Sequence, residues 1–247
     1  MITLKDIKNK TMTESKREFA KLDIFAYYVG RPISYVFTWP LLYTKIKPNT
    51  ISYISFLFII LGFVFTSFFD TPLFILIGWL FFFLWNIFDG VDGNIARYKG
   101  IYSKNGGVID AASGYLAMFM TFLAYGATAY HFDGLLTDYF NIPSYVYLIL
   151  GSIAGLALIY PRLIMHKKKT TVKQNENEDD LQDRTKYGFV KTVVLNFTSV
   201  TGFVQVFSLI CVILAFFEIY LFDIYIIGYF CINLLFMLAS IYKLFKE

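Results

Sequence analysis

The sequence has few residues that form disulfides or bind transition metals. Its 247 residues include only two cysteines and two histidines. Cys211 and Cys231 both lie inside apolar runs, so we expect them to be small packing residues rather than a disulfide or metal ligands. His131 and His166 fall in two different connecting segments, which argues against a metal site built from histidine.

Charged residues are also scarce, at 16% of the chain, whereas 57% of residues are hydrophobic and 20% are aromatic. Ordinary soluble domains are less apolar than this. The composition therefore predicts an all-α integral membrane protein with one compact bundle and excludes a second soluble domain. The charged stretch from Met1 to Leu22 lacks the apolar core and cleavage site of a signal peptide, so we expect insertion to rely on internal spans.

Six apolar segments approach the roughly 20 residues that a helix needs to cross a bilayer. The second is short and ends at an acidic motif, so we expect its helix to continue into a watery cavity. The pattern predicts a six-transmembrane-helix bundle with these spans: Ile51–Phe69, Leu73–Phe88, Val108–Tyr130, Tyr145–Ile164, Val193–Phe217 and Ile219–Tyr242.

Basic residues are missing from three of the connectors, namely 70–72, 131–143 and the turn near Glu218. All 22 lie in the N-terminal arm, the motif loop, the 162–191 loop or the C-terminal tail. This positive-inside pattern predicts a multi-pass protein whose termini and acidic motif face the cytoplasm. We expect a bacterial cell membrane, and no nucleic-acid partner is indicated because topology accounts for the basic residues.

Two further segments lie outside the spans. Residues Ala26–Tyr43 are aromatic but interrupted by Arg31, Pro32 and Pro40, so we expect an interfacial amphipathic helix rather than a seventh span. The 166–187 loop has three lysines followed by an acidic run. We interpret it as a solvated loop, with attraction of the lysines to anionic lipid as the alternative.

Three carboxylates stand out in this apolar chain. Asp89 and Asp92 are three residues apart, so they share one helix face, and Asp110 lies just inside the third span. An antiparallel helix pair would bring the three together near the cytoplasmic surface. Because ionised groups at membrane depth are costly, they persist mainly where they function. Hard oxygen ligands suit Mg²⁺, Mn²⁺ or Ca²⁺.

Small residues and one cation accompany the acids. Gly93, Ala96 and Gly106 would let a bulky ligand approach the backbone, although helix packing also favours such residues. Arg97 could clamp a phosphate or pair with an acid of the cluster. Together these residues predict a metal–phosphate site.

The order Asp-x2-Asp-Gly-x2-Ala-Arg-x8-Gly-x3-Asp, from Asp89 to Asp110, resembles the signature of the CDP-alcohol phosphatidyltransferases. The segment from Lys47 to Ser52 is similar to the Pro-Asn segment that opens the first span of that family. On this resemblance the chain divides into an N-terminal cytoplasmic or interfacial arm at 1–46 and a six-helix membrane domain at 47–247.

The resemblance implies a metal-dependent transferase of phospholipid or lipid-linked glycan biosynthesis. A substituted phosphate would pass from a CDP-alcohol, such as CDP-diacylglycerol, to a lipid or lipid-linked acceptor, with release of CMP. A homodimer is also implied. The implied roles are Mg²⁺ or Mn²⁺ binding by Asp89, Asp92 and Asp110, catalysis by Asp92 and Asp110, and a CDP pocket shaped by Asn49, Gly93, Ala96, Arg97 and Gly106.

One departure from the signature concerns the general base. The family has a fourth Asp four residues after Asp110, thought to deprotonate the acceptor, whereas this chain has Gly114. Ser113 is a poor base near neutral pH. Three explanations stay open: an acceptor that is already ionised, a base from Asp110 or the N-terminal arm, or a protein that binds nucleotide without turning it over.

Recognition of the acceptor is a separate hypothesis. Arg162 and Lys191, at the ends of the fourth and fifth spans, could face a phosphate on the acceptor, and so could Arg31. Snorkelling and topology control explain these cations equally well.

Three other functions compete with the transferase. A catalytically silent CDP-binding homologue would fit Gly114. A UbiA-type prenyltransferase also uses membrane aspartates and Mg²⁺, but its acidic motifs are spaced differently. A transporter would show internal repeats, and none is convincing.

Overall fold

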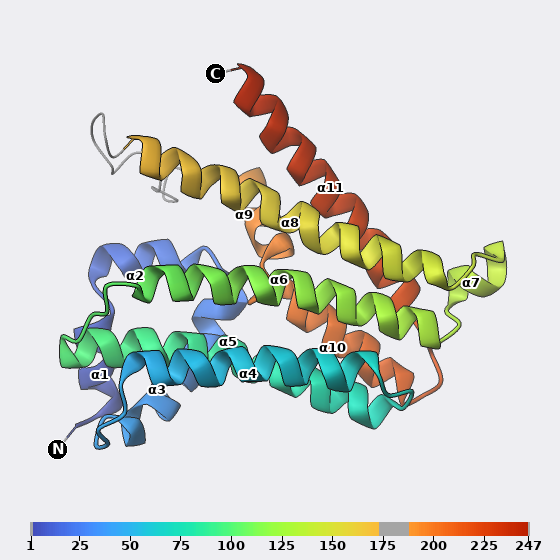
Figure 1. Cartoon of the computed structure of the whole chain (residues 1–247). Helices are drawn as coiled ribbons and strands as arrows, with labels where there is room; N and C mark the ends of the chain where they lie inside the picture. The colour runs from blue at the N-terminus through green and yellow to red at the C-terminus, as the bar shows by residue number, and fades with distance from the viewer. Residues whose placement is uncertain (1, 173–187, 247) are drawn as a thin grey trace.

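The computed structural model describes residues 2–172 and 188–246, and throughout these ranges the regular structure is helical (Figure 1). The acidic run expected at 176–183 lies outside the described residues. In chain order the elements are α1 (Leu4–Thr11), α2 (Glu14–Lys21), the π-helical turn η1 (Ala26–Gly30), α3 (Arg31–Leu41), α4 (Pro48–Ser67), α5 (Pro72–Lys99), α6 (Gly106–His131), α7 (Leu135–Phe140), α8 (Tyr145–Val172), α9 (Phe189–Thr198), α10 (Phe203–Ala215) and α11 (Phe222–Lys246).

Five of these helices are long and apolar enough to cross a membrane: α4, α5, α6, α8 and α11. The sixth expected span, Val193–Phe217, is not one straight helix. It is a pair, α9 and α10, bent by 47° at a short break, so the count is six only if the pair is one span. The chain is therefore a multi-pass helical membrane protein, as the composition predicts.

The break between α9 and α10 combines a tertiary contact with a tight turn. Ser199 leaves the helix with extended backbone angles, and its hydroxyl donates a hydrogen bond to Asp23 at 2.7 Å. The Gly202 N–H then donates to the Ser199 carbonyl in a tight turn. A Cβ on Gly202 would lie 2.9 Å from the Ser199 Cβ, so this turn requires glycine.

Two helices extend beyond the apolar segments that predict them. α5 continues through the acidic motif to Lys99 and ends at Gly100, whose φ of 68° closes the helix in the left-handed conformation. α8 continues to Val172, so His166 lies in a helix and not in a loop as the sequence suggested. The short helix α7 was not predicted; buried Asp223 accepts hydrogen bonds from the N–H groups of Leu136 and Thr137.

The bundle is held together by neighbouring long helices. α4 packs along both α5 and α6, α6 packs along α8, and α8 packs along α11, while α5 and α6 contact each other over a shorter stretch. α6 and α8 approach closely, since a Cβ on Gly151 would lie 2.4 Å from the Phe122 carbonyl oxygen. Larger residues at this crossing would push the two helices apart.

The N-terminal helices dock on the last turns of α5. In Figure 1 they lie at the same end of the bundle as the start of α6, and we call this the motif end. A buried cluster joins α1 and α3 to α4 and α5; it consists of Ile7, Tyr35, Leu42, Ile51, Ile87, Val91 and Ile95. Within 2–46, no helix is long enough to cross a membrane, in agreement with the expected absence of a seventh span.

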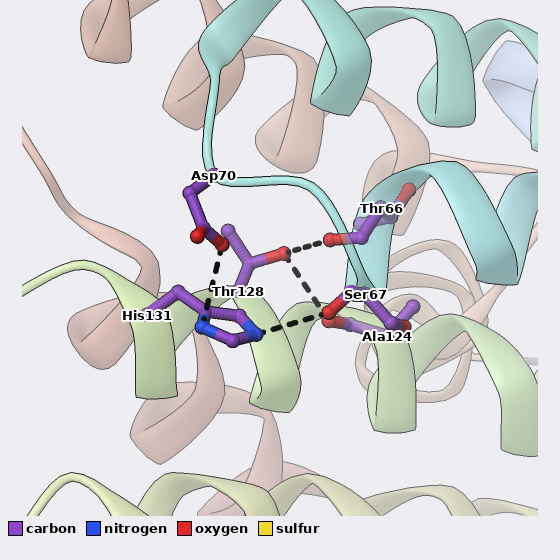
Figure 2. A network of polar contacts seen from close by, with 6 residues as sticks. All are labelled: Thr66, Ser67, Asp70, Ala124, Thr128 and His131. Carbon is purple, nitrogen blue, oxygen red and sulfur yellow. Dashed lines mark hydrogen bonds and ion pairs between the residues drawn. The ribbon is translucent and has the colours of Figure 1, made fainter.

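The opposite end of the bundle carries a polar network between α4 and α6 (Figure 2). The Thr128 hydroxyl donates to the Thr66 carbonyl at 2.9 Å, and His131 Nε2 contacts the Ser67 carbonyl at 3.1 Å. His131 Nδ1 also lies 3.3 Å from a carboxylate oxygen of Asp70. His131 is thus separated from the acidic motif by the length of α6.

Candidate active site

The acidic residues lie where α5 ends and α6 begins. Asp89 and Asp92 are half-buried, and Asp110 is exposed. The Trp85 indole N–H donates to the Ser113 hydroxyl at 2.9 Å and so fixes how the two antiparallel helices align. Asp89 is one turn after Trp85 and Asp110 is one turn before Ser113, so the two carboxylates are neighbours across the pair. Their electrostatic interaction with each other and with Asp92 agrees with this alignment.

Asp92 has a direct partner on α4. The Ser52 hydroxyl donates a hydrogen bond of 2.5 Å to Asp92 Oδ2. Ser52 lies one turn after Asn49, which is half-buried in the first turn of the same helix. The sequence gives no sign of this contact between Ser52 and Asp92, because residues 40 positions apart leave no periodic signal.

Asp89 and Asp110 make no hydrogen bond or ion pair to another side chain in the part of the chain that the structure describes. Within 2–172 and 188–246, no group of three His, Cys, Asp or Glu side chains is gathered tightly enough to hold a metal ion. The three acids thus share one end of the bundle without a closed coordination shell. As a donor set, oxygen ligands on two packed helices fit Mg²⁺ or Mn²⁺.

Arg97 lies over the glycine of the motif. A Cβ on Gly93 would lie 3.0 Å from both terminal nitrogens of the Arg97 guanidinium, so the guanidinium covers this side of the glycine. Arg97 Nη2 donates to the Asn94 side-chain oxygen at 3.2 Å, whereas Nε is buried and has no partner among the described residues. A buried unpaired donor beside acids that it does not pair with directly suits an anionic ligand.

Asn94 connects Arg97 to the N-terminal arm. Its side-chain nitrogen donates to the hydroxyls of Ser34 at 3.1 Å and Thr38 at 3.2 Å, both on α3. The arm therefore orients the arginine of the motif, a role that the sequence did not reveal. Ala96 lies between these residues, and its carbonyl accepts the Gly100 and Ile101 N–H groups that close α5. Gly106 begins α6.

More cations surround the acids. Lys16 on α2 interacts electrostatically with Arg97, Arg31 and Asp110. Burial, followed by repulsion from Arg97 and Arg31, lowers the pKa of Lys16 to about 8, against the opposing attraction of Asp110. Sequence reasoning missed Lys16, since an amphipathic helix of this length gives no sign of where it docks.

Arg162 and Lys191 are the two cations expected to face a phosphate of the acceptor, and the structure describes the side chain of only the first. Arg162 on α8 interacts electrostatically with Asp89 and Asp110, so the structure brings it to the acids. Lys191 lies in α9, and its side chain is outside the described part of the structure. Its proposed role stays a prediction.

Gly114 faces open space, since a Cβ added there would meet no atom within 4 Å. The next residue, Tyr115, has its hydroxyl 2.6 Å from Nδ1 of His166 on α8. His166 in turn interacts electrostatically with Asp110. A tyrosine–histidine pair therefore lies beside the position where the signature would have its fourth aspartate.

The fold and these residues define a multi-pass helical membrane protein with a carboxylate and arginine site at one end of its bundle. The family model for CDP-alcohol phosphatidyltransferase matches residues 45–227, and the chain belongs to this family. A search of curated proteins found no significant match. The family transfers a phosphoalcohol from a CDP-alcohol to an acceptor in a membrane and releases CMP, generally with a divalent metal.

Proposed function

We propose that the protein is an active CDP-alcohol phosphotransferase, with CDP-diacylglycerol as the first donor to test and a lipid or lipid-linked acceptor. The observation that carries the proposal is the alignment of α5 and α6 by the Trp85–Ser113 hydrogen bond, which makes neighbours of Asp89 and Asp110. Asp89 is half-buried and makes no hydrogen bond or ion pair to another described side chain, and such a carboxylate is expected mainly where it binds a cation.

The roles follow from the contacts at the motif end. Asp89, Asp92 and Asp110 would hold Mg²⁺ or Mn²⁺, which when bound neutralises diphosphate charge and makes CMP a better leaving group. Arg97, whose guanidinium lies over Gly93, would bind a diphosphate oxygen. Arg162 and Lys16 would add positive charge around the transferred phosphate.

The proposal also covers the division of the chain into domains and its orientation in the membrane. Residues 47–247 form the catalytic membrane domain, with 1–46 as an arm at the surface, and the motif end faces the cytoplasm as the distribution of basic residues indicates. In a cysteine-free background, Lys104→Cys should react with a membrane-impermeant maleimide only after cells are opened. Asp133→Cys should react in intact cells. The reverse pattern would overturn the orientation.

The first test is CMP release by the purified protein in nanodiscs. The assay supplies Mg²⁺ or Mn²⁺, a panel of CDP-alcohols and mixed membrane-lipid acceptors, with Asp110→Asn as the control. Release that the control loses supports the transferase. CDP binding without release from any donor would support a catalytically silent homologue, which Gly114 favours. Pyrophosphate release from a prenyl diphosphate would support a UbiA-type reaction instead.

A further inference from the structure

The hydrogen bond between Tyr115 and His166 joins two helices at the point where the site lacks its expected base. It is 2.6 Å long, and both side chains are half-buried. Tyr115 follows Gly114 directly on α6, and His166 lies on the cytoplasmic extension of α8 in the orientation proposed above. No residue of the family signature occupies either position.

The surroundings of this pair are those of the site and not of a remote contact. Asp110 interacts electrostatically with His166 and with Arg162, and Arg162 also interacts with Tyr115 and Asp89. Among the groups that interact with the pair are the Asp110 carboxylate, which interacts with His166, and the Arg162 guanidinium, which interacts with Tyr115. The 2.6 Å distance from the Tyr115 hydroxyl to His166 Nδ1 is short enough for a proton to pass between the two side chains.

Space for a substrate group adjoins the pair. A Cβ at Gly114 would meet nothing within 4 Å, so the backbone just before Tyr115 is open and could admit part of an acceptor. A side chain at this position would fill that volume.

We propose that Tyr115 and His166 form a proton relay that replaces the missing aspartate, so that the acceptor is a neutral alcohol and not a group already ionised. This inference rests on the proposed function. Tyr115 is the catalytic residue, because its oxygen would contact the acceptor hydroxyl, and His166 acts through Tyr115 as a positioning residue and proton store.

The proposed step balances in atoms and charge. The acceptor hydroxyl gives its proton to the Tyr115 oxygen as the Tyr115 proton passes to His166 Nδ1, which becomes imidazolium. The acceptor oxygen forms a bond to the β-phosphorus of the CDP-alcohol. The bond from this phosphorus to the bridging oxygen breaks, and CMP leaves with the electron pair. His166 later releases its proton to water.

A structural alternative is a brace between α6 and α8, and the variants are chosen to separate the two roles. His166→Gln keeps a side-chain acceptor for the Tyr115 hydroxyl but cannot store a proton near neutral pH. Tyr115→Phe keeps the ring and removes the hydroxyl. His131→Gln at the opposite end of the bundle is the matched control for histidine.

The experiment measures CMP release in nanodiscs with the donor that the wild type uses. We expect His166→Gln and Tyr115→Phe to lower kcat by about 10²- to 10⁴-fold, with an unchanged KM for the donor and an unchanged melting temperature. Gly114→Asp combined with His166→Gln should recover turnover. Imidazole added to His166→Ala should also restore it, which tests the relay even if Gly114→Asp is itself inactive.

The results separate this inference from the proposed function. No CMP release by the wild type with any donor would overturn both. Release by the wild type together with wild-type kcat in His166→Gln would overturn the relay alone. Loss of turnover that neither Gly114→Asp nor imidazole recovers, or loss that tracks a lower melting temperature, would assign the pair to the brace and overturn the relay.

Discussion

The hydrogen bond from Ser52 to Asp92 shows how a residue outside the motif can set the behaviour of one within it. Its 2.5 Å length is typical of a hydroxyl bound to a carboxylate. The same hydroxyl also contacts the Pro48 carbonyl at 3.3 Å, so its position is fixed from two sides. Ser52 would therefore orient Asp92 toward a bound cation.

Removing this hydroxyl should weaken metal binding without abolishing turnover. For Ser52→Ala we expect the Mg²⁺ concentration for half-maximal CMP release to rise by about tenfold or more, because loss of a partner to a metal ligand typically costs that much. Ser55→Ala is the matched control, since Ser55 donates only to the Ser52 carbonyl. Equal Mg²⁺ dependence in both variants would show that Ser52 does not orient Asp92.

The sequence predicts the acids of the site better than their partners. Asp89, Asp92 and Asp110 follow from spacing, because helix periodicity fixes which residues share a face. Ser52 and Asn94 act through contacts with other helices, and such contacts leave no periodic signal. His166 was misplaced for a different reason: the apolar segment ends near Ile164, but the helix continues through the lysines that follow.

At the scale of elements, glycines set the distance between α6 and α8. Gly126 and Gly151 face each other across this crossing, and a Cβ on Gly126 would lie 2.7 Å from the Tyr147 carbonyl oxygen. Small residues at such crossings let the two backbones approach closely, and the resulting van der Waals attraction stabilises the helix pair. The crossing also holds Tyr115 and His166 on facing helices.

Enlarging one of these glycines should loosen the bundle. Gly151→Ala places a Cβ 2.4 Å from the Phe122 carbonyl oxygen, which is too close for two atoms that are not bonded, so the helices must separate. We expect a loss of about 1–3 kcal/mol, seen as a lower melting temperature in detergent. Gly228→Ala on α11 is the control, since its Cβ would meet nothing within 4 Å. Matching melting temperatures in the two variants would contradict this account.

The elements were predictable where apolar runs are uninterrupted. All five long helices overlap predicted spans, because about 20 consecutive apolar residues leave few alternatives. The bend between α9 and α10 was not predicted, since hydropathy averages over the few residues from Ser199 to Gly202. The break depends on the bond from Ser199 to Asp23, which is a tertiary contact.

At the scale of the whole molecule, the N-terminal arm covers the motif end. Its helices bring Lys16 close to Arg97 and Arg31, and its α3 hydroxyls hold Asn94. The arm therefore contacts residues of the proposed site although it precedes the first long helix. Burial of apolar side chains favours docking of the arm on the motif end, whereas repulsion among Lys16, Arg97 and Arg31 opposes it.

This repulsion should make stability depend on pH. The pKa of Lys16 is about 8 in the folded protein and 10.5 ordinarily, so between these values the unfolded chain holds a proton that the folded protein lacks. Stability from this group therefore rises as pH increases from about 8 to 10.5 and is lowest below 8.

Melting temperatures measured from pH 7 to 10 test this. Lys16→Met should be more stable than the wild type at pH 7, and the difference should shrink toward pH 10. Lys5→Met, a change at an exposed lysine of α1, should leave the pH profile as in the wild type. A constant difference between Lys16→Met and the wild type across this range would rule out the linkage.

The length of α5 has a consequence for how the reaction is measured. Its 28 residues extend about 42 Å at roughly 1.5 Å per residue, which exceeds a hydrocarbon layer of about 30 Å. Asp89 lies about 26 Å from the start of the helix, near the level of the lipid headgroups. A lipid donor would thus arrive by lateral diffusion in two dimensions, and the rate would follow its mole fraction in the surface. Inert detergent dilutes that surface, so turnover in micelles should fall as detergent is added at constant donor concentration.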